Sequence, residues 1–389
     1  MKITAIDSFI LRLPTVEPIA LQFPEHRLVV AVLDTDEGVT GLGYSLVFGG
    51  GGAEAIQIYL QTRLNPILLD RDPLLVGHLW REMFHLDRGI KRQGVAAYAL
   101  SALDIGLWDL VGKAAGLPLY KLWGAVSNRI PAYGSGGWPA YSVEHLVAEA
   151  RRYVGMGFRY YKMKIHDPDP RVNRARVEAV REAVGAEIGL MVDVNQKLDV
   201  LGNIRQAGML EHLDLEWYEE PVLADDLAAC AEVAQAIAIP VATGENNYTR
   251  FEFRDLIARR AARYLMPDIC RANGFSETLR IAALAAAHQV RVTPHLVHEL
   301  SIHLLGAIDN GFLAEFVDWV PPDLFVEMPA HRDGCFIIPE RPGHGMALAP
   351  APSGNIASID RRDIPSTPGL QYLGRFLFGR SGIRASYKT

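Results

Sequence analysis

Seven residues that could carry acid, base or metal chemistry recur through the middle of the chain, nearly all of them where a short apolar run ends. They are Lys164, Asp193, Glu219, Glu245, Asp268, His295 and Glu315. Neighbouring members lie 20 to 29 residues apart, about the length of one strand, one helix and their loops. A single such residue is more often a helix cap or turn former, but caps are mostly Ser, Thr, Asn and Asp. The spacing therefore predicts a β/α barrel with an active site at the carboxyl ends of its strands.

Three of the seven, Asp193, Glu219 and Glu245, are carboxylates at the ends of three consecutive predicted strands. They should converge on one point and offer only oxygen ligands, which favours magnesium over zinc. Without a cation these carboxylates would repel one another, and one would have to take a proton. Asn195 and Glu220 are close neighbours of ligands and could hold them in place, although either could be a simple cap or surface residue.

Basic groups flank this carboxylate cluster in the sequence. Lys162 and Lys164 are two residues apart, so both side chains of the predicted strand should point into the barrel. Two like charges so close should make each ammonium easier to deprotonate, which predicts Lys164 as a base near neutral pH. Asp268 precedes His295 by one strand and could hold its ring in one tautomer. By itself, Lys162 could equally be a surface charge.

The sequence divides near residue 127 into two predicted domains. Residues 1–127 contain a β-hairpin and helical patterns at 52–69, 73–86 and 94–115, which indicate an α+β module. Strand and helix signals then alternate through residues 128–344, the predicted barrel. The Pro- and Gly-containing segment 345–389 is expected to pack back on the first module.

Composition is that of a cytoplasmic globular enzyme. The chain has 389 residues, of which 49% are hydrophobic and 22% charged. A net charge of −6 without a dense basic run argues against a nucleic-acid partner. The N-terminus lacks a signal-peptide pattern, and no apolar stretch is expected to span a membrane. Three widely spaced cysteines without a CxxC pair favour buried free thiols.

Three other motifs are less informative. Gly41-Leu42-Gly43 lacks the third glycine of a dinucleotide fingerprint and lies inside the hairpin. The run of glycines at 49–52 lacks the Lys-Ser/Thr of a phosphate loop and is a flexible connection or a mobile lid. His298 and His303 are five residues apart, whereas two metal ligands on one helical face need a spacing of four.

Taken together, the motifs resemble the enolase superfamily and, within it, the mandelate racemase subgroup. The residues that carry the resemblance are Lys162-Met163-Lys164, Asp193-Val194-Asn195, Trp217-Tyr218-Glu219-Glu220-Pro221, Gly244-Glu245, Met266-Pro267-Asp268, Pro294-His295-Leu296 and Glu315. The resemblance covers nearly the whole chain. It implies an α/β fold, a modified (β/α)7β TIM-type barrel with an α+β capping domain, and a homo-oligomer.

The resemblance also implies a role for each site residue. Its magnesium ligands would be Asp193, Glu219 and Glu245. Lys164 would be one acid/base, and His295 with Asp268 the opposed one. Glu315 would hydrogen-bond the carboxylate of a small-molecule substrate, with Lys162 beside it. The reaction would begin by removing the proton next to that carboxylate, giving an enediolate stabilised by Mg²⁺.

Residues at the expected pocket edge favour a polyhydroxy substrate over an aromatic one. His26, Arg27, Asn246, Asn247 and Tyr248 offer hydrogen bonds that an aromatic substrate would leave unmet, although each could be an ordinary rim residue. The leading hypothesis is dehydration of a sugar acid, of the galactarate or talarate type, to a 2-keto-3-deoxy acid. The alternative is a racemase or epimerase of a 2-hydroxy acid such as mandelate, and a non-catalytic scaffold is a third reading.

The loop at residues 16–30 is expected to close over the carboxyl ends of the strands. Arg27 would then meet the far end of the substrate, and the second carboxylate of a diacid would suit its planar guanidinium.

Overall fold

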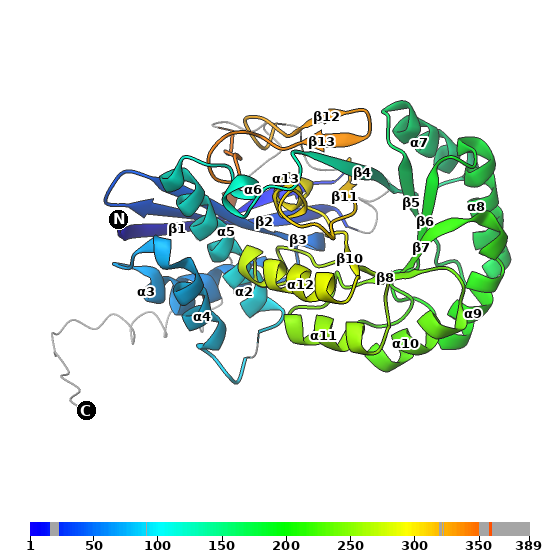
Figure 1. Cartoon of the computed structure of the whole chain (residues 1–389), viewed down its shortest axis with the longest axis horizontal. Coiled ribbons are helices and arrows are strands. Elements are labelled where there is room, and N and C mark those ends of the chain that lie inside the picture. The colour runs from blue at the N-terminus through cyan, green and yellow to red at the C-terminus, as the bar shows by residue number, and fades with distance from the viewer. Residues whose placement is uncertain (16–22, 91, 319–320, 322, 350–357, 360–389) are drawn as a thin grey trace.

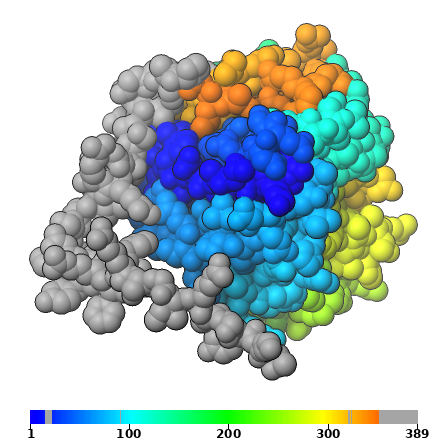
Figure 2. Space-filling model, turned by 90° about the vertical axis from the view of Figure 1, so that its left-hand side faces the viewer, coloured from blue at the N-terminus to red at the C-terminus, as the bar shows by residue number. Residues whose placement is uncertain are grey.

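The computed structural model describes residues 1–15, 23–90, 92–318, 321, 323–349 and 358–359. Figure 1 shows two parts side by side, a sheet with helices built from the N-terminal segment and a curved array of strands with helices outside it. Figure 2 views the first part from its end, where the N-terminal strands lie between the helices that follow them and the segment around β13.

The N-terminal part is an antiparallel sheet with helices against it, as the sequence predicts. Its strand order is β14-β1-β2-β3. The strands are β1 (Ile3–Pro14), β2 (Glu25–Thr35), β3 (Thr40–Val47) and β14 (Ser358–Ile359). The helices are α2 (Ala53–Tyr59), α3 (Asn65–Leu68), α4 (Val76–His85), α5 (Val95–Ala115) and α6 (Leu119–Leu122), with short helical turns at Phe48–Gly50, Leu60–Leu64 and Pro73–Leu75.

The second part is a parallel sheet that curves round on itself. Its strands are β4 (Arg129–Gly136), β5 (Tyr160–Lys164), β6 (Gly189–Asp193), β7 (Leu215–Glu219), β8 (Val241–Thr243), β9 (Tyr264–Leu265), β10 (Arg291–Val292) and β11 (Ala314–Phe316). They pair in chain order from β4 to β10, and β11 pairs with β4. A bridge from Val292 to Gly311 links β10 to the segment that leads into β11. This is the predicted β/α barrel.

Helices follow the barrel strands and cover their outer side (Figure 1). They are α7 (Val143–Gly155), α8 (Pro170–Val184), α9 (Val200–Gly208), α10 (Leu227–Ala236), α11 (Arg250–Ala258), α12 (Phe275–Ala287) and α13 (His298–Leu305), with a short turn at Glu211–Leu213. Four of these helices begin with a side chain that accepts a backbone N–H, at Ser142, Asp169, Asp199 and Asp226. These caps satisfy helix N–H groups and fix where each loop from the barrel ends.

A second hairpin extends the barrel sheet, and the sequence reading missed it. It consists of β12 (Ala330–Arg332) and β13 (Cys335–Ile337), and β13 pairs antiparallel with β4. The tail touches the first module where β14 pairs with β1 through Ile10 and Ile359. Residues 350–357 and 360–389 lie outside the described residues, so the domain boundaries and the packing of the whole tail stay predictions.

Helix α5 is long and apolar enough, by length and composition, to cross a membrane, contrary to the expectation from the sequence. However, 78% of its apolar window is buried inside the protein. It packs on β3, and its Asp104 accepts hydrogen bonds from the backbone and hydroxyl of Ser276 in α12. Burial of this kind is typical of a core helix, so α5 is weak evidence for a membrane span.

The glycines at 41 and 43 serve packing between β3 and α5. A Cβ at Gly43 would lie 1.9 Å from the carbonyl oxygen of Ala102 and 2.5 Å from the nitrogen of Gly106. Such distances are far inside van der Waals contact, so only glycine lets the strand and helix approach this closely. This contact gives a structural reason for the motif and agrees with rejecting a dinucleotide site there.

Replacing Gly43 by Ala should therefore destabilise the protein, because the helix backbone would have to move. We expect Gly43→Ala to lower the free energy of unfolding by about 1–3 kcal/mol, as overpacking does. Gly51→Ala is the matched control, since Gly51 has an ordinary φ of −67° and nothing within 4 Å of the added Cβ. Urea unfolding measures both, and equal midpoints would contradict the assignment.

Candidate functional site

Strand register brings the chemistry-bearing residues to one level of the barrel. Lys164 on β5 pairs with Asp193 on β6, which in turn pairs with Glu219 on β7. Since β5, β6 and β7 are parallel, all three residues end their strands at the same edge of the sheet. Glu245 follows β8 and His295 follows β10 at this edge. The predicted convergence at the carboxyl ends is confirmed.

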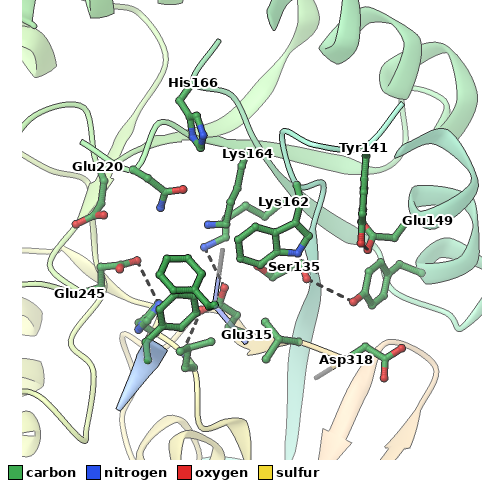
Figure 3. A pocket seen from close by; sticks show the side chains of 18 of the residues that line it. Ser135, Tyr141, Glu149, Lys162, Lys164, His166, Glu220, Glu245, Glu315 and Asp318 are labelled. Carbon is green, nitrogen blue, oxygen red and sulfur yellow. Dashed lines mark hydrogen bonds and ion pairs between the residues drawn. The ribbon is translucent and has the colours of Figure 1, made fainter. Parts of the chain in front are cut away.

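The site opens into a cavity of about 550 Å³. This is within the size range of small-molecule pockets. Figure 3 shows Lys162, Lys164 and Glu315 in its middle, with Glu245 to one side. Among the seven residues, Lys164, Glu245, His295 and Glu315 line the cavity.

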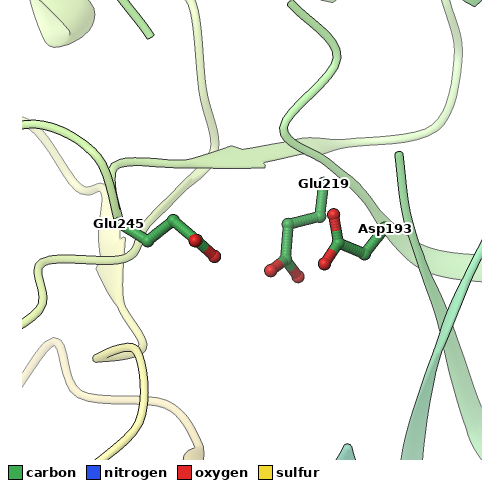
Figure 4. A group of neighbouring side chains, drawn as sticks. All are labelled: Asp193, Glu219 and Glu245. Carbon is green, nitrogen blue, oxygen red and sulfur yellow. The ribbon is translucent and has the colours of Figure 1, made fainter. Parts of the chain in front are cut away.

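Asp193, Glu219 and Glu245 form a compact carboxylate triad (Figure 4). One oxygen from each lies within 4.8 Å of the others, and all three residues are buried. Buried carboxylates at this separation repel one another unless a cation or proton intervenes. Three oxygen donors fit a hard divalent cation such as Mg²⁺, so the residues present suit the predicted metal.

The pKa of Glu219 reflects the repulsion among these buried carboxylates. Burial, together with the charges of Asp193 and other carboxylates, raises the pKa of Glu219 to about 8, although Lys162 opposes the shift. Asp193 behaves differently: burial disfavours its charge, but Lys164 and Lys162 more than compensate and hold its pKa below the usual value. A proton on Glu219 or a cation bound to the triad would each relieve this repulsion near neutral pH.

Lys162 lies in the middle of the buried charges. Its ammonium is 2.6 Å from Glu219 Oε1 and 3.0 Å from Glu315 Oε1. Burial works against its charge, but Glu219 and Glu315 hold the pKa of Lys162 well above its usual value. Glu315 also accepts the backbone N–H of Leu296 at 2.9 Å. Lys162 is therefore a fixed positive charge rather than the surface charge considered as its alternative.

Lys164 differs from its prediction. Its Nζ lies 2.7 Å from Asp193 Oδ2. Burial lowers the pKa of Lys164, and Lys162 lowers it further, but Asp193 outweighs both and the net shift is upward. The expectation that Lys162 makes Lys164 easy to deprotonate is wrong for this arrangement, because the carboxylate lies closer to the ammonium than the sequence could show.

His295 and Asp268 form the predicted pair. His295 Nδ1 lies 2.8 Å from Asp268 Oδ2, and its Nε2 lies 3.3 Å from Glu245 Oε2. Arg271 completes this group and was missed from the sequence. Its guanidinium lies 3.2 Å from Asp268 Oδ2 and donates to the Glu245 backbone oxygen at 3.1 Å. The position of Arg271, three residues after Asp268, is the signal that could have indicated it.

Asn195 and Glu220, the two residues expected to hold the metal ligands in place, lie beside those ligands. Asn195 donates its backbone N–H to Asp193 Oδ1 and its amide to Oδ2, both at 2.8 Å. Glu220 accepts from Gln196 at 2.6 Å and from Asn246 at 2.8 Å. Burial and the charge of Glu245 raise the pKa of Glu220 well above its usual value. Asn195 can therefore orient Asp193, whereas Glu220 is buried and hydrogen-bonded to Gln196 and Asn246.

The residues expected to bind substrate lie differently from their prediction. Arg27 binds Glu25 at 2.7 Å and also pairs with Glu54. His26 is buried against the Phe48 ring, and burial lowers its pKa to about 4. Asn247 is buried and donates to Ala224. Tyr248, the next residue, is half-buried. The lining residues in the described part of the chain do not include Arg27, His26, Asn247 or Tyr248, and residues 16–22 of the proposed loop lie outside it.

The cavity has a second group of lining residues that the sequence reading missed. Trp138 lies in the loop after β4, with its ring 5.2 Å from Lys164 Nζ. Helix α7 contributes further lining residues, and Phe48 completes another part of the wall, whereas Asn246, which also lines the cavity, was expected at the pocket edge. These side chains follow no chemical motif, so their position became visible only once α7 was placed beside β4.

Comparison with known proteins agrees with this architecture. Residues 6–124 match the family described as mandelate racemase / muconate lactonizing enzyme, N-terminal domain, and residues 145–351 match the enolase C-terminal domain-like family. The chain belongs to the enolase superfamily. The superfamily resemblance inferred from its motifs, and the capped barrel fold implied by it, are thereby confirmed.

Two curated relatives of this enolase superfamily member process sugar acids, as their names state. It is 35% identical over 324 residues to 3,6-anhydro-alpha-L-galactonate cycloisomerase of Streptomyces coelicolor, covering 83% of this chain and 90% of that protein. It is 34% identical over 327 residues to L-talarate/galactarate dehydratase of Salmonella typhimurium, covering 84% of this chain and 81% of that protein.

A solved structure of a third superfamily member carries the metal. L-Talarate dehydratase from Polaromonas sp. JS666, complexed with Mg and L-glucarate, superposes with a TM-score of 0.84 at 32% identity. The match covers 93% of this chain and 99% of that one. Together with the buried triad, this supports the magnesium cofactor predicted from the sequence.

Magnesium should stabilise the folded protein through the triad. A ligand that binds only the native state raises its stability as RT ln(1 + [L]/Kd). We expect Mg²⁺ to raise the melting temperature of the wild type, and Glu219→Gln to lose at least about tenfold in Mg²⁺ affinity, or 1.4 kcal/mol. Glu327→Gln is the control, because Glu327 is exposed and pairs with Arg341 away from the site. An unchanged Mg²⁺ shift in Glu219→Gln would contradict the ligand assignment.

Proposed function

We propose that this protein is a magnesium-dependent hydro-lyase that dehydrates a sugar acid to a 2-keto-3-deoxy acid. The observation that carries the proposal is that Lys164 and His295 line the same cavity as Glu245 of the triad, from β5 and from the loop after β10. These strands are well separated in the sheet order, so the two groups can act on different faces of one substrate. A general acid and a general base on two faces are what dehydration needs.

The proposed magnesium ligands are Asp193, Glu219 and Glu245. When bound there, Mg²⁺ would draw the substrate carboxylate to the triad and stabilise the negative charge that develops on it. Lys162 would supply a second fixed positive charge, because its ammonium lies between Glu219 and Glu315 and burial has not removed its proton. Glu315 would hold Lys162 and the Leu296 backbone in place beside the substrate.

Proton transfer would fall to Lys164 and His295. Lys164 must be neutral to take the proton next to the carboxylate, and its ion pair with Asp193 holds that proton on in the structure. Any cation that competes for Asp193 would weaken the ion pair and lower the pKa of Lys164. His295, oriented by Asp268, would give its proton to the departing hydroxyl, which leaves as water. The resulting enol then tautomerises to the 2-keto acid.

A racemase or epimerase remains the second candidate. It is favoured by one observation, a magnesium-bound structure described as a racemase from Streptomyces coelicolor A3(2), with a TM-score of 0.85 at 33% identity. The same two groups would then remove and return one proton, on a substrate whose neighbouring hydroxyl stays in place. A non-catalytic scaffold would have no use for an opposed acid and base around a carboxylate triad. The homo-oligomer and the cytoplasmic location remain predictions.

The roles of Lys164 and His295 in proton transfer can be distinguished by substituting one of them. We expect His295→Asn to lower sugar-acid dehydration by at least about a hundredfold, the scale of general acid catalysis. The variant should still exchange the substrate proton facing Lys164 with heavy water, which proton NMR detects. His288→Asn is the matched control, since His288 is exposed at the end of α12 outside the cavity lining.

Normal dehydration by His295→Asn would show that His295 is not the acid. Racemisation of a 2-hydroxy acid, without keto acid from any sugar acid, would favour the second candidate.

A further inference from the structure

The cavity extends beyond the reacting groups to a patch that we call the α7 end, formed by Tyr141, His145, Glu149, Arg152 and Asp318. Figure 3 shows Tyr141, Glu149 and Asp318 on one side, Glu220 and Glu245 on the other, and the two lysines between them. A substrate whose carboxylate lies at the triad would therefore have room to extend its remote carbons toward α7.

The wall of the α7 end is built rigidly. Arg176 donates to the backbone oxygen of Tyr141 at 2.6 Å and to that of Trp138 at 3.0 Å. Tyr141 stacks on His145 with ring centroids 3.9 Å apart. These contacts hold the loop and its rings without any substrate.

The charged side chains of the α7 end already have partners within the protein. Glu149 accepts the Gly137 N–H and the Tyr161 hydroxyl, both at 2.7 Å. Arg152 pairs with Asp318 at 2.6 Å, and its guanidinium also lies 4.6 Å from the Tyr153 ring. The α7 end thus holds two carboxylates and one guanidinium, so a further carboxylate would have to displace Asp318 to pair with Arg152.

The other Lys and Arg side chains that line the cavity are paired with carboxylates or lie away from α7 in the sheet order. Lys162, Lys164 and Arg271 are each paired with carboxylates of the catalytic group. Lys197 is exposed on the loop after β6, two strands from β4 in the sheet order. Arg27, the residue that had suggested a diacid, is held by Glu25 and Glu54.

We propose that the α7 end selects sugar acids with a single carboxylate, whose remote end is a neutral hydroxyl or ring, over sugar diacids. The inference rests on the proposed function, because it takes the substrate carboxylate to lie at the triad. It names the substrate class as aldonic rather than aldaric acids. The aromatic faces of Tyr141 and Trp138 suit the apolar face of a sugar chain or ring, whereas a second carboxylate would lie beside the carboxylates of Asp318 and Glu149.

The test uses aldonates and aldarates in pairs that share configuration at every chiral carbon, with Mg²⁺ present. Two readouts are measured for each pair: kcat/KM for keto acid formation and Kd by calorimetry. We expect the aldonate of the preferred configuration to be favoured by at least about tenfold in both. Equal or better use of the aldarate would overturn the inference while leaving the dehydratase intact.

A substitution makes the test specific to the α7 end. Asp318→Asn removes one carboxylate and releases Arg152, so the aldarate-to-aldonate ratio of kcat/KM should rise by at least about tenfold. Asp333→Asn is the matched control, an exposed aspartate that pairs with Arg129 outside the cavity, and should leave the ratio unchanged. A ratio unmoved by Asp318→Asn, or an aldarate affinity that instead depends on Lys197→Ala, would contradict the proposal.

The two proposals can fail separately. Selective binding of the aldonate without turnover or proton exchange would support the α7 end and contradict the dehydratase. Absence of both binding and turnover for every pair would overturn both.

Discussion

The arrangement of the site depends on one electrostatic constraint, the burial of three carboxylates within 4.8 Å of one another. Most of the other charged groups of the site reduce the repulsion among these carboxylates. Lys162 and Lys164 each pair with a member of the triad, and Arg271 and His295 both contact Glu245. Even with these partners, Glu219 keeps a pKa of about 8, so the cluster still lacks positive charge at neutral pH. A divalent cation supplies that charge, and this is why a barrel edge rich in acids can serve as a metal centre.

The fold provides this arrangement through strand register and close packing. Cα pairing sets Lys164, Asp193 and Glu219 side by side, which no single helix or loop could do. The cap needs its own close packing, because Gly43 brings β3 against α5 and α5 in turn holds α12 through Asp104. The catalytic edge and its cover are thus positioned by backbone contacts remote from the chemistry, as a preorganised site requires.

Much of this could be predicted from the sequence, because a polar residue that closes an apolar run reports both the strand and its end. The triad and the pair of His295 with Asp268 follow from that signal. The direction in which the pKa of Lys164 shifts could not be predicted, since it depends on the 2.7 Å distance to Asp193. Arg27 was expected to meet the substrate because its pairing with Glu54, a residue of a different element, could not be foreseen from the sequence. The α7 end was missed because Tyr141 and Arg152 reach the cavity only through the packing of α7 beside β4.

The proton inventory of magnesium binding tests most directly the claim that a cation resolves the charge conflict. Calorimetric titration at pH 7 in buffers of different ionisation enthalpy counts the protons released. Glu219, with its pKa near 8, should lose its proton as Mg²⁺ binds, so release should be clear at pH 7 and fade as the pH rises above 8. Magnesium affinity should correspondingly weaken as the pH falls. Tight binding without proton release at pH 7 would show that the triad was already fully charged, and would contradict the account.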